Sequence, residues 1–122
     1  MLKDSLYKII SIDHSATEIN AALEVDARNE IFKGHFPEHP TLPGACMLQM
    51  VKEVLEDALK TSLKLQKGDN LKFLSLVDPE QNNLLLLQIN YTIDDSIVKV
   101  NASLDSKEVV CFKFQGTFVK AD

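Results

Sequence analysis

One segment of this 122-residue chain has the periodicity of a helix, and this limits the folds that the chain can adopt. Between residues 45 and 61, apolar residues recur every three or four positions, so they form a single broad stripe. The stripe contains Leu48, Val51, Val54, Leu55, Ala58 and Leu59. The opposite side carries Lys52, Glu53, Glu56 and Lys60. This pattern predicts one long amphipathic helix with a solvated polar face.

The start of this helix is marked by Pro43, whose missing N–H would be unpaired in a first turn in any case. The pairs Lys52/Glu56 and Glu56/Lys60 have the spacing of favourable ion pairs on one helix face. We expect residues 67–70, a Lys-Gly-Asp-Asn run, to form the loop that leaves the helix.

The remaining segments have the pattern of strands. Residues 18–26 alternate most clearly, with apolar side chains on one side and polar side chains mostly on the other. Further strands are expected over residues 7–12, 71–77, 84–92, 97–104 and 109–120. Their short polar connectors favour antiparallel hairpins. One helix packed on one face of an antiparallel sheet gives an α+β fold.

Composition narrows the class of protein further. A length of 122 residues with 45% hydrophobic residues suits one domain, covering residues 1–122, with a single core. The net charge of −5 and the pI of about 5.1 oppose nonspecific binding to nucleic acid or to an anionic membrane. We therefore expect neither as a partner.

The N-terminal residues lack the apolar core and the cleavage site of a secretory signal, and no run approaches the roughly 18 apolar residues of a membrane span. Cys46 and Cys111 each lie in an apolar run, which favours two buried, reduced thiols of a cytoplasmic protein. His14 follows a predicted strand without a nearby metal-ligating partner, and we interpret it as a solvated turn residue.

The stretch GHFPEHPTLPG, residues 34–44, concentrates prolines, glycines and histidines immediately before the helix. Its prolines fix their own backbone angles and restrict the preceding residues, so the loop is stiff and holds His35 in one place. Gly44 leaves a backbone N–H unshielded at the positive end of the helix dipole, where an oxyanion is stabilised. A histidine near such a site can enolise a carbonyl compound.

Two other interpretations of this stretch remain. A histidine in a proline-rich loop is often only a structural turn residue. Metal binding through His35, Glu38 and His39 is less favoured, because the prolines prevent a helix that would align them and no further ligand cluster appears. We expect no metal and no cofactor.

The elements His35-Phe36-Pro37, Pro40 and Pro43-Gly44, followed by the long helix, resemble the HFPxxPxxPG signature of the 3-hydroxyacyl-acyl carrier protein dehydratases. This resemblance implies a hotdog fold, in which a curved antiparallel sheet wraps around a central helix, and a homodimer or an assembly of dimers. It places His35 in the catalytic position, gives the Gly44 N–H the role of polarising the thioester carbonyl, and puts Pro43 and Phe36 beside the substrate.

The chain departs from the family at one position. The family's catalytic carboxylate, usually Glu, falls five residues after the glycine, and Gln49 stands there. The family often has a Gln four residues later, where this chain has Glu53. An amide can bind a hydroxyl group or a water molecule but cannot release a proton at neutral pH. Loss of a positioned acid lowers the rate roughly 10²- to 10⁴-fold.

Several sources of that proton stay open. His35 could return the abstracted proton to the leaving hydroxyl, Glu53 could reach the site although its position favours solvent, and Glu38 is a weaker candidate. Gln49 itself fits the polar helix face as well as it fits a site lining. Met47 and Met50 fit the core better than a substrate tunnel.

The resemblance implies a dehydratase of 3-hydroxyacyl thioesters carried by acyl carrier protein or coenzyme A. Gln49 keeps two alternatives open: a non-catalytic acyl-binding or partner subunit, and a hotdog thioesterase. Chain length, carrier and pathway, whether fatty acid, aryl polyene or polyketide, are not fixed by these residues.

Overall fold

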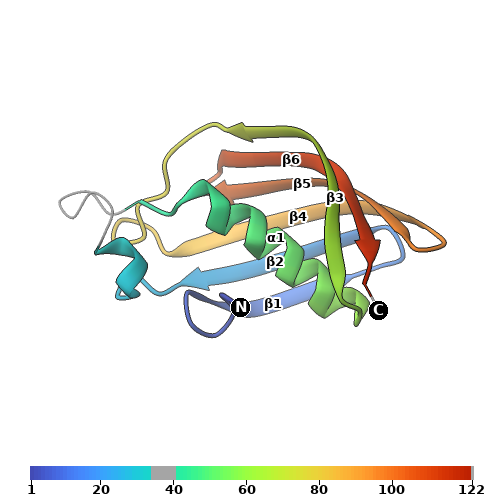
Figure 1. Ribbon diagram of the computed structural model, residues 1–122. Helices are drawn as coiled ribbons and strands as arrows, with labels where there is room; N and C mark the ends of the chain where they lie inside the picture. The colour runs from blue at the N-terminus through green and yellow to red at the C-terminus, as the bar shows by residue number, and fades with distance from the viewer. Residues whose placement is uncertain (34–40, 122) are drawn as a thin grey trace.

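The computed structural model describes residues 1–33 and 41–121, which form a six-stranded antiparallel sheet and one long helix (Figure 1). The sheet order is β1-β2-β4-β5-β6-β3. Its strands are β1 (Tyr7–His14), β2 (Glu18–Val25), β3 (Leu63–Phe73), β4 (Leu84–Asp94), β5 (Ile97–Ser106) and β6 (Val109–Lys120). The helices are the short 3₁₀ helix η1 (Glu30–Phe32) and the long helix α1 (Gly44–Leu59).

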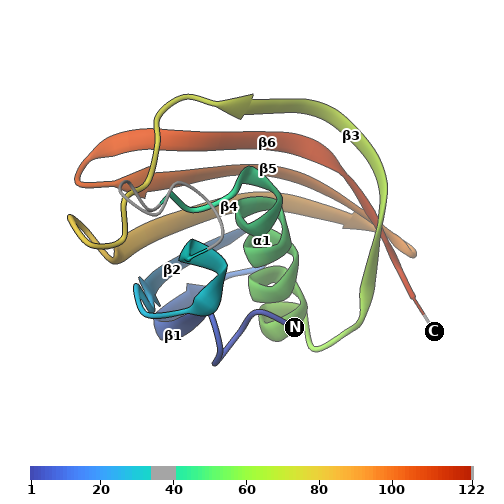
Figure 2. The same cartoon turned by 60° about the vertical axis from the view of Figure 1, so that its left-hand side comes forward.

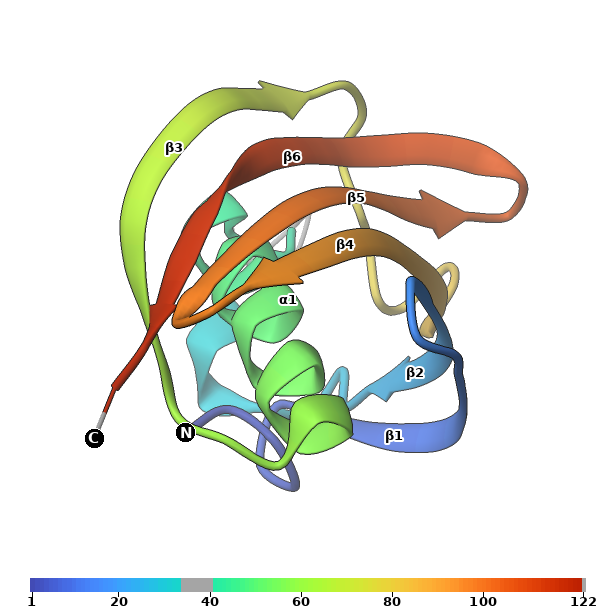
Figure 3. The same cartoon turned by 90° about the vertical axis from the view of Figure 1, so that its right-hand side faces the viewer.

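The sheet curls around α1, which lies against its concave face (Figure 3). The core fills the space between them with the inward side chains of the strands and the apolar stripe of the helix. Its largest buried members include Tyr7, Phe112, Phe114, Phe118, Leu23, Met50, Leu55 and Leu87. The α+β class and the hotdog arrangement expected from the sequence are therefore confirmed.

Helix α1 confirms the predicted amphipathic helix, although it begins one residue before the predicted range of 45–61 and ends two residues earlier. Pro43 occupies the N-cap rather than the first turn, and after Leu59 the chain leaves the helix through Lys60 in a left-handed conformation with φ of 55°. Within the described residues, Glu56 makes no ion pair with Lys52 or Lys60. It instead accepts a 2.8 Å hydrogen bond from the Leu63 N–H, which fixes the turn into β3.

Strand β3 differs most from the prediction. It begins at Leu63 rather than residue 71, and residues 67–70, expected to form a loop, lie inside it. Register shifts occur on both sides of residues 67 and 68, where β3 pairs with β6. A Cβ added to Gly116 of β6 would lie 2.5 Å from the Lys67 carbonyl oxygen. The turn-forming residues therefore mark β-bulges where two backbones approach closely.

The other strands start and end within two residues of their predicted limits. His14 is exposed, as expected, although it is the last residue of β1 rather than a turn residue. Cys46 and Cys111 are buried and free, and Met47 and Met50 belong to the core. Across residues 1–33 and 41–121, no helix is long and apolar enough to cross a membrane.

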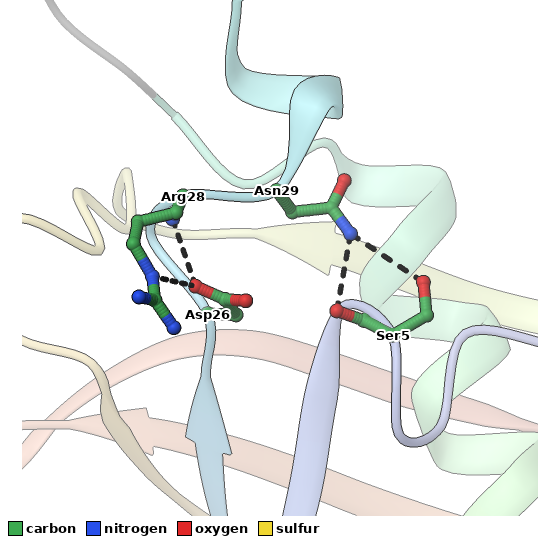
Figure 4. A network of polar contacts seen from close by, with 4 residues as sticks. All are labelled: Ser5, Asp26, Arg28 and Asn29. Carbon is green, nitrogen blue, oxygen red and sulfur yellow. Dashed lines mark hydrogen bonds and ion pairs between the residues drawn. The ribbon is translucent and has the colours of Figure 1, made fainter.

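A small polar network fixes the segment that follows β2 (Figure 4). Asp26 accepts hydrogen bonds from the backbone and side chain of Arg28, and Asn29 donates from its amide to the Ser5 carbonyl oxygen at 3.1 Å. The Asn29 side chain also caps η1 by accepting from the Ile31 N–H. This network anchors η1, which lies at the same end of the sheet as the start of α1 (Figure 2).

Candidate functional site

The predicted site residues fall into two groups. His35 and Phe36, together with Glu38 and His39, lie outside the described residues. Pro43, Gly44 and Gln49 lie on α1 or at its N-cap. The geometry of the site is therefore built from the start and the middle of α1.

Within residues 1–33 and 41–121, the start of α1 has a backbone donor without a hydrogen-bond partner. Pro43 provides no side-chain cap, and the first turn carries no acidic residue. The Pro43 carbonyl oxygen accepts from the N–H groups of Cys46 and Met47, at 3.0 and 3.2 Å. Within the described residues, the Gly44 N–H has no hydrogen-bond acceptor. Such a helix end attracts a negatively charged or polarised oxygen.

The ring of Phe73 lies directly over Gly44. A Cβ added to Gly44 would be 2.5 Å from the Phe73 ring, so a residue with a side chain would displace the ring or the helix. Phe73 ends β3, stacks on Phe112 with ring centroids 5.1 Å apart, and is 57% exposed. Glycine thus allows the ring to lie this close to the helix, and an exposed aromatic ring forms one wall beside the helix end.

More apolar surface is exposed next to this wall. On β3, the inward-facing Leu65 and Leu71 are 38% and 40% exposed, and Leu74 and Leu76 follow in the next segment at 52% and 82%. The Leu42 N–H donates to the Val77 carbonyl oxygen at 2.9 Å, which ties this segment to the start of α1. The helix end therefore lies beside an uncovered apolar surface.

Gln49 lies near the middle of α1 and belongs to a polar cluster centred on the buried Glu53. Its Nε2 donates to Glu53 Oε2 at 2.8 Å. The same carboxylate accepts from the backbone N–H of Leu2 at 2.9 Å, from that of Lys3 at 2.8 Å and from the Tyr7 hydroxyl at 3.1 Å. The Glu53 side chain of α1 therefore holds the N-terminal segment and β1 in place.

The expectation that Glu53 lies on a solvated helix face was wrong, because its side chain is only 1% exposed. The two oxygens of a carboxylate offer about four acceptor positions, and four donors occupy them. Burial alone would raise the pKa of Glu53, but these hydrogen bonds outweigh it and hold the pKa below the ordinary value. Glu53 is therefore an ionised anchor with little capacity to act as a proton donor.

Gln49 remains half-buried and keeps some of its hydrogen-bonding capacity. One amide N–H is used by Glu53, which leaves the second N–H and the carbonyl oxygen. Gln49 also borders a groove of about 530 Å³ between the N-terminal residues and α1, lined by Met1, Lys52 and Glu56 among others. An uncharged group with one free donor and one free acceptor can bind a hydroxyl group there.

No part of the described chain gathers three or more His, Cys, Asp or Glu side chains in a way that could hold a metal ion. Cys46 lies in the first turn of α1, where a helix dipole would favour a thiolate. Burial, followed by the charge of Glu53, instead raises the pKa of its thiol. Cys46 is therefore poorly suited to be a nucleophile.

Sequence analysis missed three residues of this region: Glu53 as an anchor, Tyr7 and Phe73. Glu53 follows Met50 by three positions and Cys46 by seven, a spacing that puts it at the edge of the buried stripe. Tyr7 and Phe73 carry no comparable signal, because their neighbours come from elements distant in the sequence.

Comparison with known proteins agrees with this architecture. The family model of the ApeI-like proteins, described as ApeI dehydratase, matches residues 11–115. A 3-hydroxyacyl-[acyl-carrier-protein] dehydratase FabZ of Lactococcus lactis subsp. cremoris is 30% identical over 104 residues, which cover 79% of this chain and 72% of the relative. A FabZ of Xanthomonas campestris pv. campestris is 27% identical over 119 residues, covering 85% and 78%.

Among solved structures, the dehydratase heterocomplex ApeI:P from Xenorhabdus doucetiae has the same fold. It superimposes with a TM-score of 0.75 at 22% identity, covering 91% of this chain and 96% of the other. The class of protein defined by fold and sequence is thus the hotdog-fold thioester dehydratases. Within this class, the chain belongs to the ApeI-like dehydratase family.

Proposed function

We propose that this protein dehydrates 3-hydroxyacyl thioesters to trans-2-enoyl thioesters. The observation that carries the proposal is the start of α1 at Gly44, which lacks a side-chain cap and is the last residue of the His35 to Gly44 motif. Family membership and the activity named for the FabZ relatives support the same reaction. The relatives' name also supports acyl carrier protein as the carrier, with coenzyme A as the alternative.

In the proposed reaction, His35 removes a proton from the carbon next to the thioester carbonyl. The Gly44 N–H stabilises the charge that develops on the carbonyl oxygen. The C–O bond to the 3-hydroxyl then breaks, and the departing group takes one proton to leave as water. Phe36 and Pro43 border the substrate in this proposal, together with the Phe73 ring that lies against Gly44.

The proton for the leaving group is assigned to His35, which returns the one that it abstracted. Gln49 binds the hydroxyl group without donating a proton outright, because an amide does not ionise near neutral pH. Glu53 is unsuited to the task, since its carboxylate is already filled with donors. We therefore expect a slower reaction than a carboxyl group at position 49 would allow.

The test is to follow interconversion of 3-hydroxyacyl and enoyl thioesters by absorbance, using both acyl carrier protein and coenzyme A as carriers. We expect turnover in both directions, and a loss of at least 10²-fold in His35→Ala. His14→Ala is the matched control, because His14 is an exposed histidine at the end of β1. Absence of interconversion with both carriers would refute the proposal.

We also propose that two copies assemble through the β3 edge, giving a homodimer or an assembly of dimers. Strand β3 is a sheet edge of 11 residues, and all but Leu63 are exposed. Long edges with exposed apolar side chains favour pairing with another chain. Sedimentation analysis would give the mass of two 13.7 kDa chains, and a monomeric wild type would contradict the assembly.

A second candidate function is a non-catalytic partner subunit that pairs with an active homologue. Gln49 in the acid position favours it, and ApeI:P of Xenorhabdus doucetiae is a dehydratase heterocomplex. Gln49→Glu separates the two: a large gain in dehydration favours an intact site that lacks its acid, and no gain favours a binding role. Release of free thiol in the same assay would instead indicate a thioesterase.

A further inference from the structure

Glu53 is the one fully buried charged side chain within the described residues, and the reaction proposed above does not use it. It is connected to three parts of the fold. The N-terminal segment contributes the amides of Leu2 and Lys3, β1 contributes the Tyr7 hydroxyl, and α1 contributes Gln49. A buried carboxylate with this many partners fixes the position of each.

The charge state of Glu53 determines how the Gln49 amide is turned. An ionised carboxylate accepts hydrogen bonds but cannot donate them, so the Gln49 NH₂ group must face it and the carbonyl oxygen must face away. The 2.8 Å contact between Nε2 and Oε2 has this polarity. A glutamine without such a partner would sample several rotamers and both amide orientations.

We propose that Glu53 is a positioning residue that holds the Gln49 amide in one orientation for the hydroxyl group of the substrate. This inference rests on the dehydratase function proposed above. The bond to the carboxylate uses one N–H of Gln49, so the other N–H and the carbonyl oxygen are the groups that would bind the substrate hydroxyl. Because the bond is charge-assisted, it also polarises the amide and makes its carbonyl oxygen a better acceptor.

The same arrangement links the site to the N-terminal segment. Residues 2 and 3 reach Glu53 through backbone N–H groups, and the Lys3 ammonium also pairs with Asp57 one helical turn further on, at 3.1 Å. The Lys3–Asp57 pair holds the segment without touching Gln49. Asp57→Asn is therefore a matched control that loosens the segment but leaves the contact between Glu53 and Gln49.

A double-mutant cycle separates positioning from general stability. We expect Glu53→Gln to lower kcat about 10-fold with little change in KM, the size of one charge-assisted hydrogen bond. In a Gln49→Leu background, Glu53→Gln should lower kcat no further, because the side chain through which it acts is gone. Asp57→Asn should leave kcat unchanged. Additive losses in the cycle would overturn the proposal.

A second measurement needs neither activity nor a destabilised variant. In ¹⁵N-labelled wild-type protein, the side-chain amide signals of Gln49, identified by their loss in Gln49→Leu, should shift as the Glu53 carboxylate is protonated. The titratable groups around Glu53 are Lys3 and Asp4 of the N-terminal segment, Tyr7 of β1, and Cys46, Lys52, Glu56 and Asp57 of α1. Of these, Asp4, Glu56 and Asp57 are carboxylic acids like Glu53 and need control variants.

The Gln49 titration should therefore persist in Asp4→Asn, Glu56→Gln and Asp57→Asn and disappear in Glu53→Gln. A Gln49 signal that does not change with pH, or that follows one of the other three carboxylates, would overturn the positioning role whatever the activity. A wild type without dehydratase activity would refute the proposed function, and the amide titration would still decide whether Glu53 orients Gln49. If Glu53→Gln does not fold, the wild-type titration and the Asp4, Glu56 and Asp57 variants decide the question.

Discussion

The start and the middle of α1 differ in whether their hydrogen-bonding groups have partners. At the start, the Gly44 N–H has no acceptor in the described chain, and an exposed Phe73 ring lies beside it. In the middle, the Glu53 carboxylate is buried and filled by four donors. Unsatisfied donors can act on a ligand directly, whereas a saturated carboxylate can only hold the groups that are bonded to it. On the same helix, the group proposed to act on the substrate and the buried anchor thus lie about two and a half turns apart.

The largest effect should come from removing the anchor. Glu53→Ala leaves the N–H groups of Leu2 and Lys3, the Tyr7 hydroxyl and the Gln49 amide without their acceptor. We expect the free energy of unfolding to fall by about 3 to 5 kcal/mol, because buried donors without partners are costly. Urea denaturation followed by circular dichroism measures this. Asp57→Ala removes only a partly exposed ion pair and should cost less than about 1 kcal/mol. Equal losses would show that Glu53 is no special anchor.

The next largest effect should come from adding a second carboxylate. In Gln49→Glu, the new side chain would lie within hydrogen-bond distance of Glu53, where the wild-type atoms are 2.8 Å apart. Two such carboxylates share a proton, so one pKa rises above its unfolded value. Folding then binds a proton, and stability is highest at acid pH and is lost as pH rises through the raised pKa. We expect a loss of about 1 to 3 kcal/mol at pH 7.

Chemical denaturation of Gln49→Glu between pH 4 and pH 8 tests this, and Gln49→Glu with Glu53→Gln provides the control. The double variant keeps one carboxyl and one amide in reversed order, so its stability should no longer fall as pH rises. A Gln49→Glu variant whose stability is the same at pH 4 and pH 8 would mean that the two side chains move apart.

The wild type should have a pH dependence of the opposite sign. Hydrogen bonding lowers the folded pKa of Glu53 below its ordinary value of 4.5. Its contribution to stability is therefore complete above that ordinary value and is lost as pH falls through the folded pKa. The urea midpoint should fall between pH 5 and pH 3, and Glu53→Gln should reduce that fall. An unchanged slope in Glu53→Gln would assign the acid sensitivity to other carboxylates.

The smallest effect on stability should come from Gly44→Ala. The new methyl group would press on the Phe73 ring, which can swing outward because it is exposed, and alanine favours the helix. We expect a change of less than about 1 kcal/mol in the free energy of unfolding. Activity should fall more clearly, because the methyl group occupies the space beside the N–H. Adding Phe73→Ala to Gly44→Ala should relieve the contact. If the two substitutions change the free energy of unfolding additively, the two residues are not in direct contact.

Local patterns predicted most elements of the fold but misplaced β3. The period of residues 45–61 and the alternation of residues 18–26 report burial directly, and both elements were confirmed. Residues 67–70 have the composition of a loop because they form bulges against β6. Whether a Gly-Asp pair ends a strand or bends it depends on a partner strand that arrives almost fifty residues later in the chain.

Less of the candidate site was predictable. The resemblance predicted that His35, Gly44 and Gln49 belong to the site. The structure adds the surroundings of Gly44 and Gln49. Glu53 was assigned to solvent because its neighbours Lys52 and Glu56 are polar, yet it is buried under residues from the N-terminus. Phe73 reaches Gly44 only because β3 ends beside the start of α1.

The sequence by itself determined the helix, the α+β class and the stiff motif before Gly44, because periodicity and proline act within a few residues. The tertiary structure decided what each polar side chain does. Glu53 could have been a solvated charge or a proton donor, and it became an anchor because Leu2, Lys3 and Tyr7 bring donors to it from distant parts of the chain. Long-range contacts of this kind produce no periodic pattern in the sequence, because the packing of helices and strands determines which residues meet.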